Sequence, residues 1–141
     1  MRKVFTFFYG SYINKNVLKD VNIFLDKWEA AKLPGFDITI KPYANLIKSA
    51  KDCVYGILTQ LTHDELKRLY FHAEEVFHEI YLPEAVLVQT FDDKWVTSLC
   101  YICQNMEEKP ADKNYVERIV QPAKEYNFPL WYIEKLESFK K

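Results

Sequence analysis

The sequence predicts a single α+β domain, and three observations lead to this class. Strand-like and helix-like segments follow one another in the order β, β, β, α, β, β, α, α, which differs from a repeated βαβ unit and favours a mixed or antiparallel sheet. A chain of 141 residues suits one domain, 1–141, with a core of its own. With 49% hydrophobic and 16% aromatic residues, the chain has enough apolar surface for a packed core, which excludes intrinsic disorder.

Strands are expected at three places in the first half of the chain. Residues 4–9 form a β-branched and aromatic run that ends at a Gly-Ser pair. A Leu-Pro-Gly turn at 33–35 precedes residues 36–40, whose alternation of apolar and polar side chains is typical of a half-buried strand. Residues 53–58 form the next strand.

The clearest helix start in the sequence is at Thr62. Its hydroxyl can cap the backbone while Glu65, three residues later, reaches back to the Thr62 amide, as in a capping box. Leu61 and Leu66 stand where a hydrophobic staple would pack. From Leu66 to Ala73, apolar residues recur at offsets of 0, 3, 4 and 7, which gives the helix one apolar face.

The second half of the chain is expected to hold a hairpin and two helices. The strand-like runs 85–91 and 95–103 are separated by Asp-Asp-Lys, a sequence typical of a turn. Asp112 begins a helix with one apolar face, and Pro122 is expected to bend or end it because proline has no backbone amide to donate. Apolar residues at intervals of three within 130–136 predict a short terminal helix.

Composition and charge exclude several classes of partner. The formal net charge is −1, so the chain lacks the basic surface that nucleic acid or an anionic membrane would require. No apolar run approaches the ~18 residues that cross a bilayer, and the start of the chain does not resemble a secretory signal. The three cysteines are odd in number and suggest no disulfide framework, so we expect a reducing, cytoplasmic location. The oligomeric state is left open.

Two patterns invite a metal or redox interpretation. Cys100 and Cys103 have the CxxC spacing, but they lie in a strand-like run, where residues three apart point to opposite faces of a sheet. No second CxxC follows, so we interpret both as buried structural residues that bind no metal and form no mutual disulfide. The histidine and glutamate side chains between His72 and His78 match no established ligand spacing, and no metal or other cofactor is expected.

The segment Tyr9-Gly10-Ser11-Tyr12-Ile13 follows the first predicted strand. A glycine at this point allows the backbone to turn sharply and leaves successive N–H groups free to point at one anion, as in an anion-binding nest. The other interpretation is an ordinary turn at the end of a strand. One glycine is a weak signal, so spacing alone favours the ordinary turn.

Glu74 is the candidate general acid/base. If the helix that begins at Thr62 extends this far, Glu74 lies on the edge of its apolar face and near its C-terminus, where the helix dipole is negative. The dipole and aromatic neighbours such as Phe77 and Tyr81 disfavour the charged form, which suits a group that exchanges protons near neutral pH. The alternative is a solvated glutamate, and Glu75 beside it is the competing candidate.

These segments occur in an order that resembles a known family over nearly the whole chain. The Tyr-Gly-Ser loop after an N-terminal strand is similar to the opening of the gamma-glutamylcyclotransferases and the related AIG2-like proteins. Residues 54–58 resemble the family's V-[WY]-G strand, and residues 61–69 resemble the helix start that follows it. Glu74-Glu75-Val76 is similar to the family's E-G-V segment. Later segments that match are Cys100-Tyr101-Ile102, Pro110 with Tyr115 and Val116, Phe128-Pro129, and Tyr132 to Leu136.

The resemblance implies a small mixed β-barrel of about five to six strands with flanking helices and a pocket beside the Tyr-Gly-Ser loop. In the family, amides of this loop hold the glutamyl end of the substrate. A glutamate transfers protons while the substrate's α-amine attacks its γ-carbonyl, which releases 5-oxoproline and a free amine without a cofactor. The resemblance implies Glu74 as the acid/base. The implied substrate-binding residues are Tyr9, Gly10, Ser11, Tyr12, Ile13, Tyr81, Tyr101 and Tyr115.

The chain differs from the family pattern in three places. Tyr12 replaces an Asn, Glu75 replaces a Gly, and one extra residue lies between Leu69 and Glu74. Beside a cyclotransferase acting on a small gamma-glutamyl amine or amino acid, two other functions fit the sequence. One is a pocket protein that binds a small carboxylate without turnover, and the other is a partner-binding domain with an unused cleft. A carboxylate at position 74 favours the cyclotransferase over the partner-binding domain, but it does not distinguish the cyclotransferase from the carboxylate-binding protein.

Overall fold

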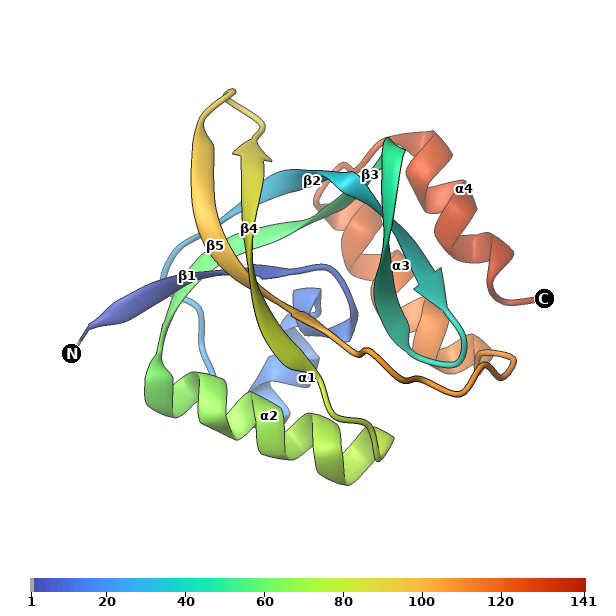
Figure 1. The fold of residues 1–141 in the computed structure, drawn as a ribbon, viewed down its shortest axis with the longest axis horizontal. Helices are drawn as coiled ribbons and strands as arrows, with labels where there is room; N and C mark the ends of the chain where they lie inside the picture. Colours follow the sequence, from blue (N-terminus) through green and yellow to red (C-terminus); the bar gives the residue numbers. More distant parts are fainter. Residues whose placement is uncertain (1) are drawn as a thin grey trace.

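The computed structural model describes residues 2–141, and a closed five-stranded barrel lies at its centre (Figure 1). Strands β1 and β5 run parallel where Thr6 pairs with Leu99, whereas the other neighbouring strands are antiparallel. The predicted α+β class with a small mixed barrel is therefore confirmed. In the order β1-β3-β2-β4-β5 around the barrel, the strands are β1 (Lys3–Phe8), β3 (Ala44–Thr62), β2 (Trp28–Ile40), β4 (Leu82–Thr90) and β5 (Trp95–Ile102).

Strands β2 and β3 form a hairpin that is longer than the sequence pattern predicts. The predicted turn at 33–35 is wrong, because these residues lie within β2. The pairing with β3 shifts register between Pro34 and Phe36, and Gly35 has a φ of +88°, a left-handed conformation that glycine adopts without strain. An irregularity of this kind accommodates a proline, which has no amide for the ladder, so the strand continues through a turn-like sequence.

Helix α2 (His63–Phe77) begins where the sequence predicts. The amide of Glu65 donates to Oγ1 of Thr62 at 3.2 Å, and the Thr62 amide donates to Oε1 of Glu65 at 2.9 Å, so both halves of the capping box form. The helix ends at His78, whose φ of 57° is left-handed. The residues buried on its apolar face are Leu66, Leu69 and Ala73.

Two short elements after β1 have no counterpart among the sequence predictions. They are a 3₁₀ turn, η1 (Ser11–Ile13), and a helix of six residues, α1 (Lys15–Asp20). The side chain of Asn14 caps α1 by accepting a hydrogen bond from the Asn16 amide at 2.9 Å. Elements this short do not span enough turns to show a helical period in the sequence.

Helix α3 (Lys113–Glu125) starts after its predicted cap, Asp112, and continues past Pro122. Proline at this position lacks the amide that would donate to the Arg118 carbonyl one turn earlier. The side-chain amide of Asn14 donates to that carbonyl instead, at 3.0 Å. The helix was expected to bend or end near Pro122. It ends three residues later, at Glu125, because a side chain from a distant part of the sequence replaces the missing hydrogen bond, and the bend stays a prediction.

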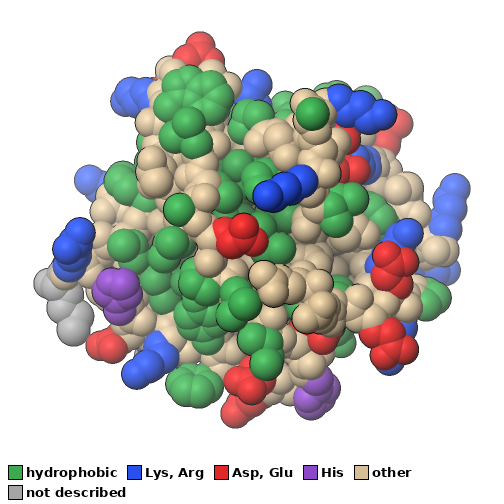
Figure 2. Space-filling view, viewed as in Figure 1, with side chains coloured by type: hydrophobic (Ala, Val, Ile, Leu, Met, Phe, Trp, Pro, Cys, Tyr) green, Lys and Arg blue, Asp and Glu red, His purple; other side chains and the backbone are tan. Residues whose placement is uncertain are grey.

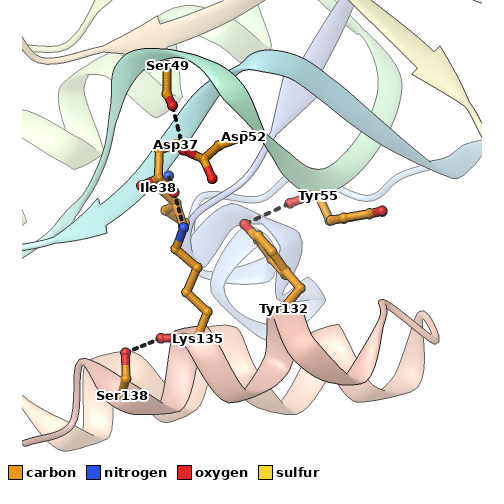
Figure 3. Close-up of polar contacts among 8 residues, drawn as sticks. All are labelled: Asp37, Ile38, Ser49, Asp52, Tyr55, Tyr132, Lys135 and Ser138. Carbon is orange, nitrogen blue, oxygen red and sulfur yellow. Dashed lines mark hydrogen bonds and ion pairs between the residues drawn. The ribbon is translucent and has the colours of Figure 1, made fainter.

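Helix α4 (Leu130–Ser138) packs beside α3 and is tied to the β2–β3 hairpin by polar contacts (Figure 3). Lys135 forms an ion pair with the Asp37 carboxylate, and both side chains are partly buried. The buried Tyr132 side chain donates from its hydroxyl to the Tyr55 carbonyl at 3.5 Å. Helices α3 and α4 thus cover one side of the barrel, and α2 lies on another side (Figure 1).

The β4–β5 hairpin also forms as predicted. Its turn is closed by the Thr90 amide, which donates to the Lys94 carbonyl at 2.8 Å, and Asp93 takes a φ of 66°. Within residues 2–141, no helix combines the length and the apolar character needed to cross a membrane.

Candidate active site

A pocket opens between the end of β1, the turn η1 and helix α2. It encloses about 570 Å³ of empty space when its open mouth is counted. Figure 2 shows hydrophobic side chains gathered on the face where β4 and β5 cross above α2. All the residues that line the pocket are uncharged. They are Phe7, Phe8, Tyr9, Gly10, Ser11, Tyr12, Ala44, Leu66, Leu69, Tyr70, Ala73, Phe77, Tyr81, Tyr101 and Tyr115.

The structure brings most of the predicted substrate-binding residues together on the wall of this pocket. They come from four separate parts of the chain: the loop after β1, the start of β4, the end of β5 and helix α3. Ile13 differs from the others, because it is buried in the hydrophobic core and does not line the pocket. The predicted residues on the wall are Tyr9, Gly10, Ser11, Tyr12, Tyr81, Tyr101 and Tyr115.

Gly10 allows the loop to lie close against β3. A Cβ atom at this position would be 2.9 Å from the Cβ of Ala44, closer than side chains approach. Its φ of −103° is not left-handed, so glycine is needed here for space. The first hydrogen bond of η1 runs from the Ile13 amide to the Gly10 carbonyl at 3.1 Å. The preceding amides, of Ser11 and Tyr12, have no acceptor within the turn.

Three tyrosine hydroxyls hold the wall together. The Tyr9 hydroxyl donates to the Tyr101 carbonyl at 2.6 Å, and the Tyr81 hydroxyl donates to the Ala44 carbonyl at 2.7 Å. The hydroxyl oxygen of Tyr115 accepts from the Ala44 amide at 3.0 Å. A phenol that accepts a hydrogen bond still has its own proton to donate, so Tyr115 keeps a donor for a ligand.

Burial keeps these phenols protonated. It raises the pKa of Tyr9 and of Tyr81 well above the ordinary value. Burial also raises the pKa of Tyr115, to about 12, while the Ala44 amide, the Ser11 side chain and the Arg118 charge act in the opposite direction. At neutral pH the tyrosines of the wall therefore act as hydrogen-bonding groups and not as bases.

Tyr12 connects the loop to α2. Its hydroxyl lies 2.9 Å from Nδ1 of His72, and its ring meets Phe8 edge-on with the centroids 5.9 Å apart. Burial lowers the pKa of His72, although the carboxylates of Asp20 and Glu75 oppose this change. A neutral imidazole can accept the Tyr12 proton at Nδ1, which fixes the Tyr12 ring on the pocket wall.

Glu74 lies on the exposed side of α2, and Ala73 occupies the place on the wall. The helix is regular, so residues three to four apart share a face, and Tyr70, Ala73 and Phe77 line the pocket together. Each residue turns a regular helix by about 100°. Because Ala73 faces the pocket, the next residue, Glu74, points away from the wall. The Glu74 side chain does not line the pocket. Its role as acid/base stays a prediction.

Eight residues of the wall were not among the predicted site residues: Phe7, Phe8, Ala44, Leu66, Leu69, Tyr70, Ala73 and Phe77. Tyr70 and Phe77 share the helical period of the apolar face of α2, which is the signal that could have found them. Ala44 begins β3, and no pattern in the sequence connects it with the Tyr-Gly-Ser loop.

Both cysteines of the CxxC pattern are buried. Cys100 lies within β5, and Cys103 follows just beyond its end. Burial raises the pKa of both thiols, which leaves them protonated and unreactive at neutral pH. The Asn45 side chain donates to the Cys103 carbonyl at 2.7 Å and accepts from its amide at 3.0 Å, a structural tie between β3 and the end of β5. Among residues 2–141, no three His, Cys, Asp or Glu side chains gather as a metal site.

The fold and the pocket together define a small barrel protein with a tyrosine-lined site beside an N-terminal loop. The sequence profile of the AIG2-like family matches residues 53–136. Gamma-glutamylcyclotransferases of Bos taurus and Homo sapiens are 33% and 32% identical over 95 residues, 67% of this chain and 50% of each relative. A solved structure of a gamma-glutamyl cyclotransferase has a TM-score of 0.84 and 26% identity, covering 97% of this chain and 88% of that chain.

The chain belongs to the AIG2-like family. Its fold is that of the gamma-glutamylcyclotransferases. The chain spans about half the length, 50%, of the curated relatives that it matches.

Proposed function

We propose that the chain is a gamma-glutamylcyclotransferase-type enzyme that converts a small gamma-glutamyl amine or amino acid to 5-oxoproline and a free amine. The proposal rests on one observation, the uncharged tyrosine-lined pocket beside the loop of residues 9–13, in a chain of the AIG2-like family. Membership of the family supports the reaction type. The geometry of the pocket supports the place where the substrate binds.

The glutamyl end of the substrate is proposed to bind at the loop. The amides of Ser11 and Tyr12 precede the first hydrogen bond of η1 and supply donors for a carboxylate. The Tyr115 hydroxyl supplies another donor, because it accepts from Ala44 and keeps its own proton. Gly10 lets this loop lie directly against Ala44 of β3, and both residues line the pocket.

Cyclisation joins two groups of the same molecule, so correct placement supplies much of the rate enhancement. The α-amine must lose protons and the leaving amine must gain them, which requires a proton carrier. Glu74 is the carrier proposed from the family pattern. Its carboxylate lies on the outer side of α2, so it would have to meet the substrate at the mouth of the pocket and not from the wall.

Substitutions at neighbouring glutamates test this assignment. In an assay of 5-oxoproline release from a panel of gamma-glutamyl compounds, Glu74→Gln is expected to lower kcat by ~10²–10⁴-fold, because glutamine cannot carry a proton. Glu75→Gln is the matched control, since it removes an adjacent exposed carboxylate. Equal activities of the two variants would remove Glu74 from the mechanism, and no release by the unmodified chain would refute the cyclotransferase proposal.

A second candidate is a protein that binds a small carboxylate without turnover. The observation in its favour is the absence of any carboxylate on the described pocket wall, where Ala73 faces the cavity. Calorimetric binding of 5-oxoproline without any release of 5-oxoproline from gamma-glutamyl compounds would establish this second function. Ala73→Glu, which places a carboxylate on the wall, is the informative variant in that case.

A further inference from the structure

Hydrogen-bonding groups and apolar side chains lie on different sides of the pocket. The free donors, the first amides of η1 and the Tyr115 hydroxyl, are on the loop side. Tyr9 and Tyr81 offer no donor to a ligand, because their protons are used by backbone carbonyls. The side formed by α2 has no charged group and is apolar apart from the Tyr70 hydroxyl, which is hydrogen-bonded to Tyr101. Its residues are Leu66, Leu69, Tyr70, Ala73 and Phe77.

The charges around the pocket have a matching arrangement. On the loop side, the Cζ atom of Arg118 lies 5.9 Å from the centre of the Tyr115 ring. On the α2 side, an acidic segment, residues 74–79, contains three glutamates and no lysine or arginine. Its charge acts on the wall: burial is the main cause of the raised pKa of Tyr81, and Glu79 adds to it. An anion is therefore favoured at the loop and disfavoured beside α2.

We propose that the site selects gamma-glutamyl amides whose leaving amine is apolar and has no carboxylate, in preference to gamma-glutamyl amino acids. This inference rests on the proposed function, with the carboxylate of the glutamyl end at the loop and the leaving amine against the apolar wall of α2. A second carboxylate on the leaving group would be desolvated on a wall without a cation. It would also lie near the acidic segment, where like charges repel.

The reaction is the same for both classes of substrate. The α-amine nitrogen bonds to the γ-carbonyl carbon, and the bond from that carbon to the leaving nitrogen breaks. Of the three protons of the α-ammonium group, one stays on the lactam nitrogen and two pass to the leaving amine, which departs as an ammonium ion. No oxidant or further reactant is needed. The selectivity therefore arises from how the pocket accommodates the leaving group.

Two compounds that differ by one carboxylate test the proposal. They are gamma-L-glutamyl-3-methylbutylamide and gamma-L-glutamyl-L-leucine, which have the same hydrocarbon in the leaving amine. We expect kcat/KM to be at least about tenfold higher for the amide at low ionic strength, because the second carboxylate meets like charge. The ratio of the kcat/KM of the methylbutylamide to that of the leucine compound should decrease as added salt screens the acidic segment. Equal values, or a preference for the leucine compound, would overturn the proposal.

Variants separate the contribution of charge from that of fit. Glu79→Gln removes one charge of the acidic segment, so it should raise kcat/KM for the leucine compound and narrow the ratio. Ala73→Lys supplies a cation at the wall and should narrow the ratio further. If one variant fails to fold, the other decides. A ratio that neither change alters would show that the acidic segment and the uncharged wall do not set the selectivity.

Calorimetric titration of the full chain with both compounds distinguishes failure of this inference from failure of the proposed function. Absence of 5-oxoproline release from either compound refutes the cyclotransferase, and the two affinities then test the selectivity. Tighter binding of the methylbutylamide supports the inference. Equal affinities, tighter binding of the leucine compound, or no binding of either overturns it.

Discussion

Gly56 lies where β3 runs close against the backbone of β1. A Cβ atom at this position would be 2.0 Å from the carbonyl oxygen of Phe8, which is a backbone atom that cannot move aside. Ile57 pairs with Phe8 in the ladder, so any displacement would open the barrel beside the Tyr-Gly-Ser loop. We expect Gly56→Ala to lower the free energy of unfolding by more than about 4 kcal/mol, or to prevent folding.

Gly35→Ala is the matched control for Gly56→Ala. Gly35 has a φ of +88°, but no atom lies within 4 Å of the place that a Cβ would take, so its substitution strains the backbone without a clash. We expect a loss of about 1–2 kcal/mol, the usual cost of a left-handed conformation for a residue with a Cβ. Urea unfolding of both variants measures the difference. Similar losses at the two positions would contradict the close approach of β3 to β1.

Individual residues were predictable where their effect is local. The capping box of Thr62 and Glu65 is visible in the sequence, because its partners are three residues apart. The roles of the glycines were not visible. Gly10 and Gly56 are needed for space beside Ala44 and Phe8, and those neighbours become known only when the strands are paired.

At the scale of elements, Asn14 links the start of α1 to the middle of α3. Its Oδ1 caps α1, and its side-chain amide donates to the Arg118 carbonyl that Pro122 leaves without a partner. Asn14→Asp keeps the capping oxygen and removes the amide donor. We expect this variant to lose about 0.5–1.5 kcal/mol of stability, the usual net value of one hydrogen bond, in urea unfolding.

The same substitution in a Pro122→Ala background provides the control. Alanine restores the backbone amide at position 122, which can donate to Arg118 within the helix. The loss caused by Asn14→Asp should then be smaller, and the difference between the two backgrounds measures the contact between the elements. An equal loss in both backgrounds would show that the Asn14 bond does not substitute for the one that proline removes.

The elements could be predicted where a period extends over several turns or an alternation over several residues. Helices α2, α3 and α4 and the β4–β5 hairpin satisfy this condition. Helix α1 is too short, and Pro122 and the turn-like segment 33–35 obey local rules that distant contacts override. Long-range contacts therefore decided the course of β2 and α3 where the sequence pattern was overridden, whereas α1 was missed because of its length.

For the whole molecule, the order of the elements predicted the α+β class, and the resemblance to the gamma-glutamylcyclotransferases predicted the barrel and the tyrosines of the pocket. The orientation of Glu74 was not predictable in the same way, since neighbouring residues of a regular helix point about 100° apart and it is Ala73 that lines the pocket. An alignment compares residue types, whereas the pocket depends on the rotation of α2. The fold was therefore more predictable than the chemistry of the site.

The central claim is that the pocket between the 9–13 loop and α2 is the substrate site. A crystal structure of the full chain with 5-oxoproline tests it most directly. We predict that 5-oxoproline lies in this pocket, with its carboxylate within hydrogen-bonding distance of the Ser11 and Tyr12 amides and close to the Tyr115 hydroxyl. Binding of 5-oxoproline elsewhere on the surface, or an empty pocket in crystals grown at saturating 5-oxoproline, would contradict the account.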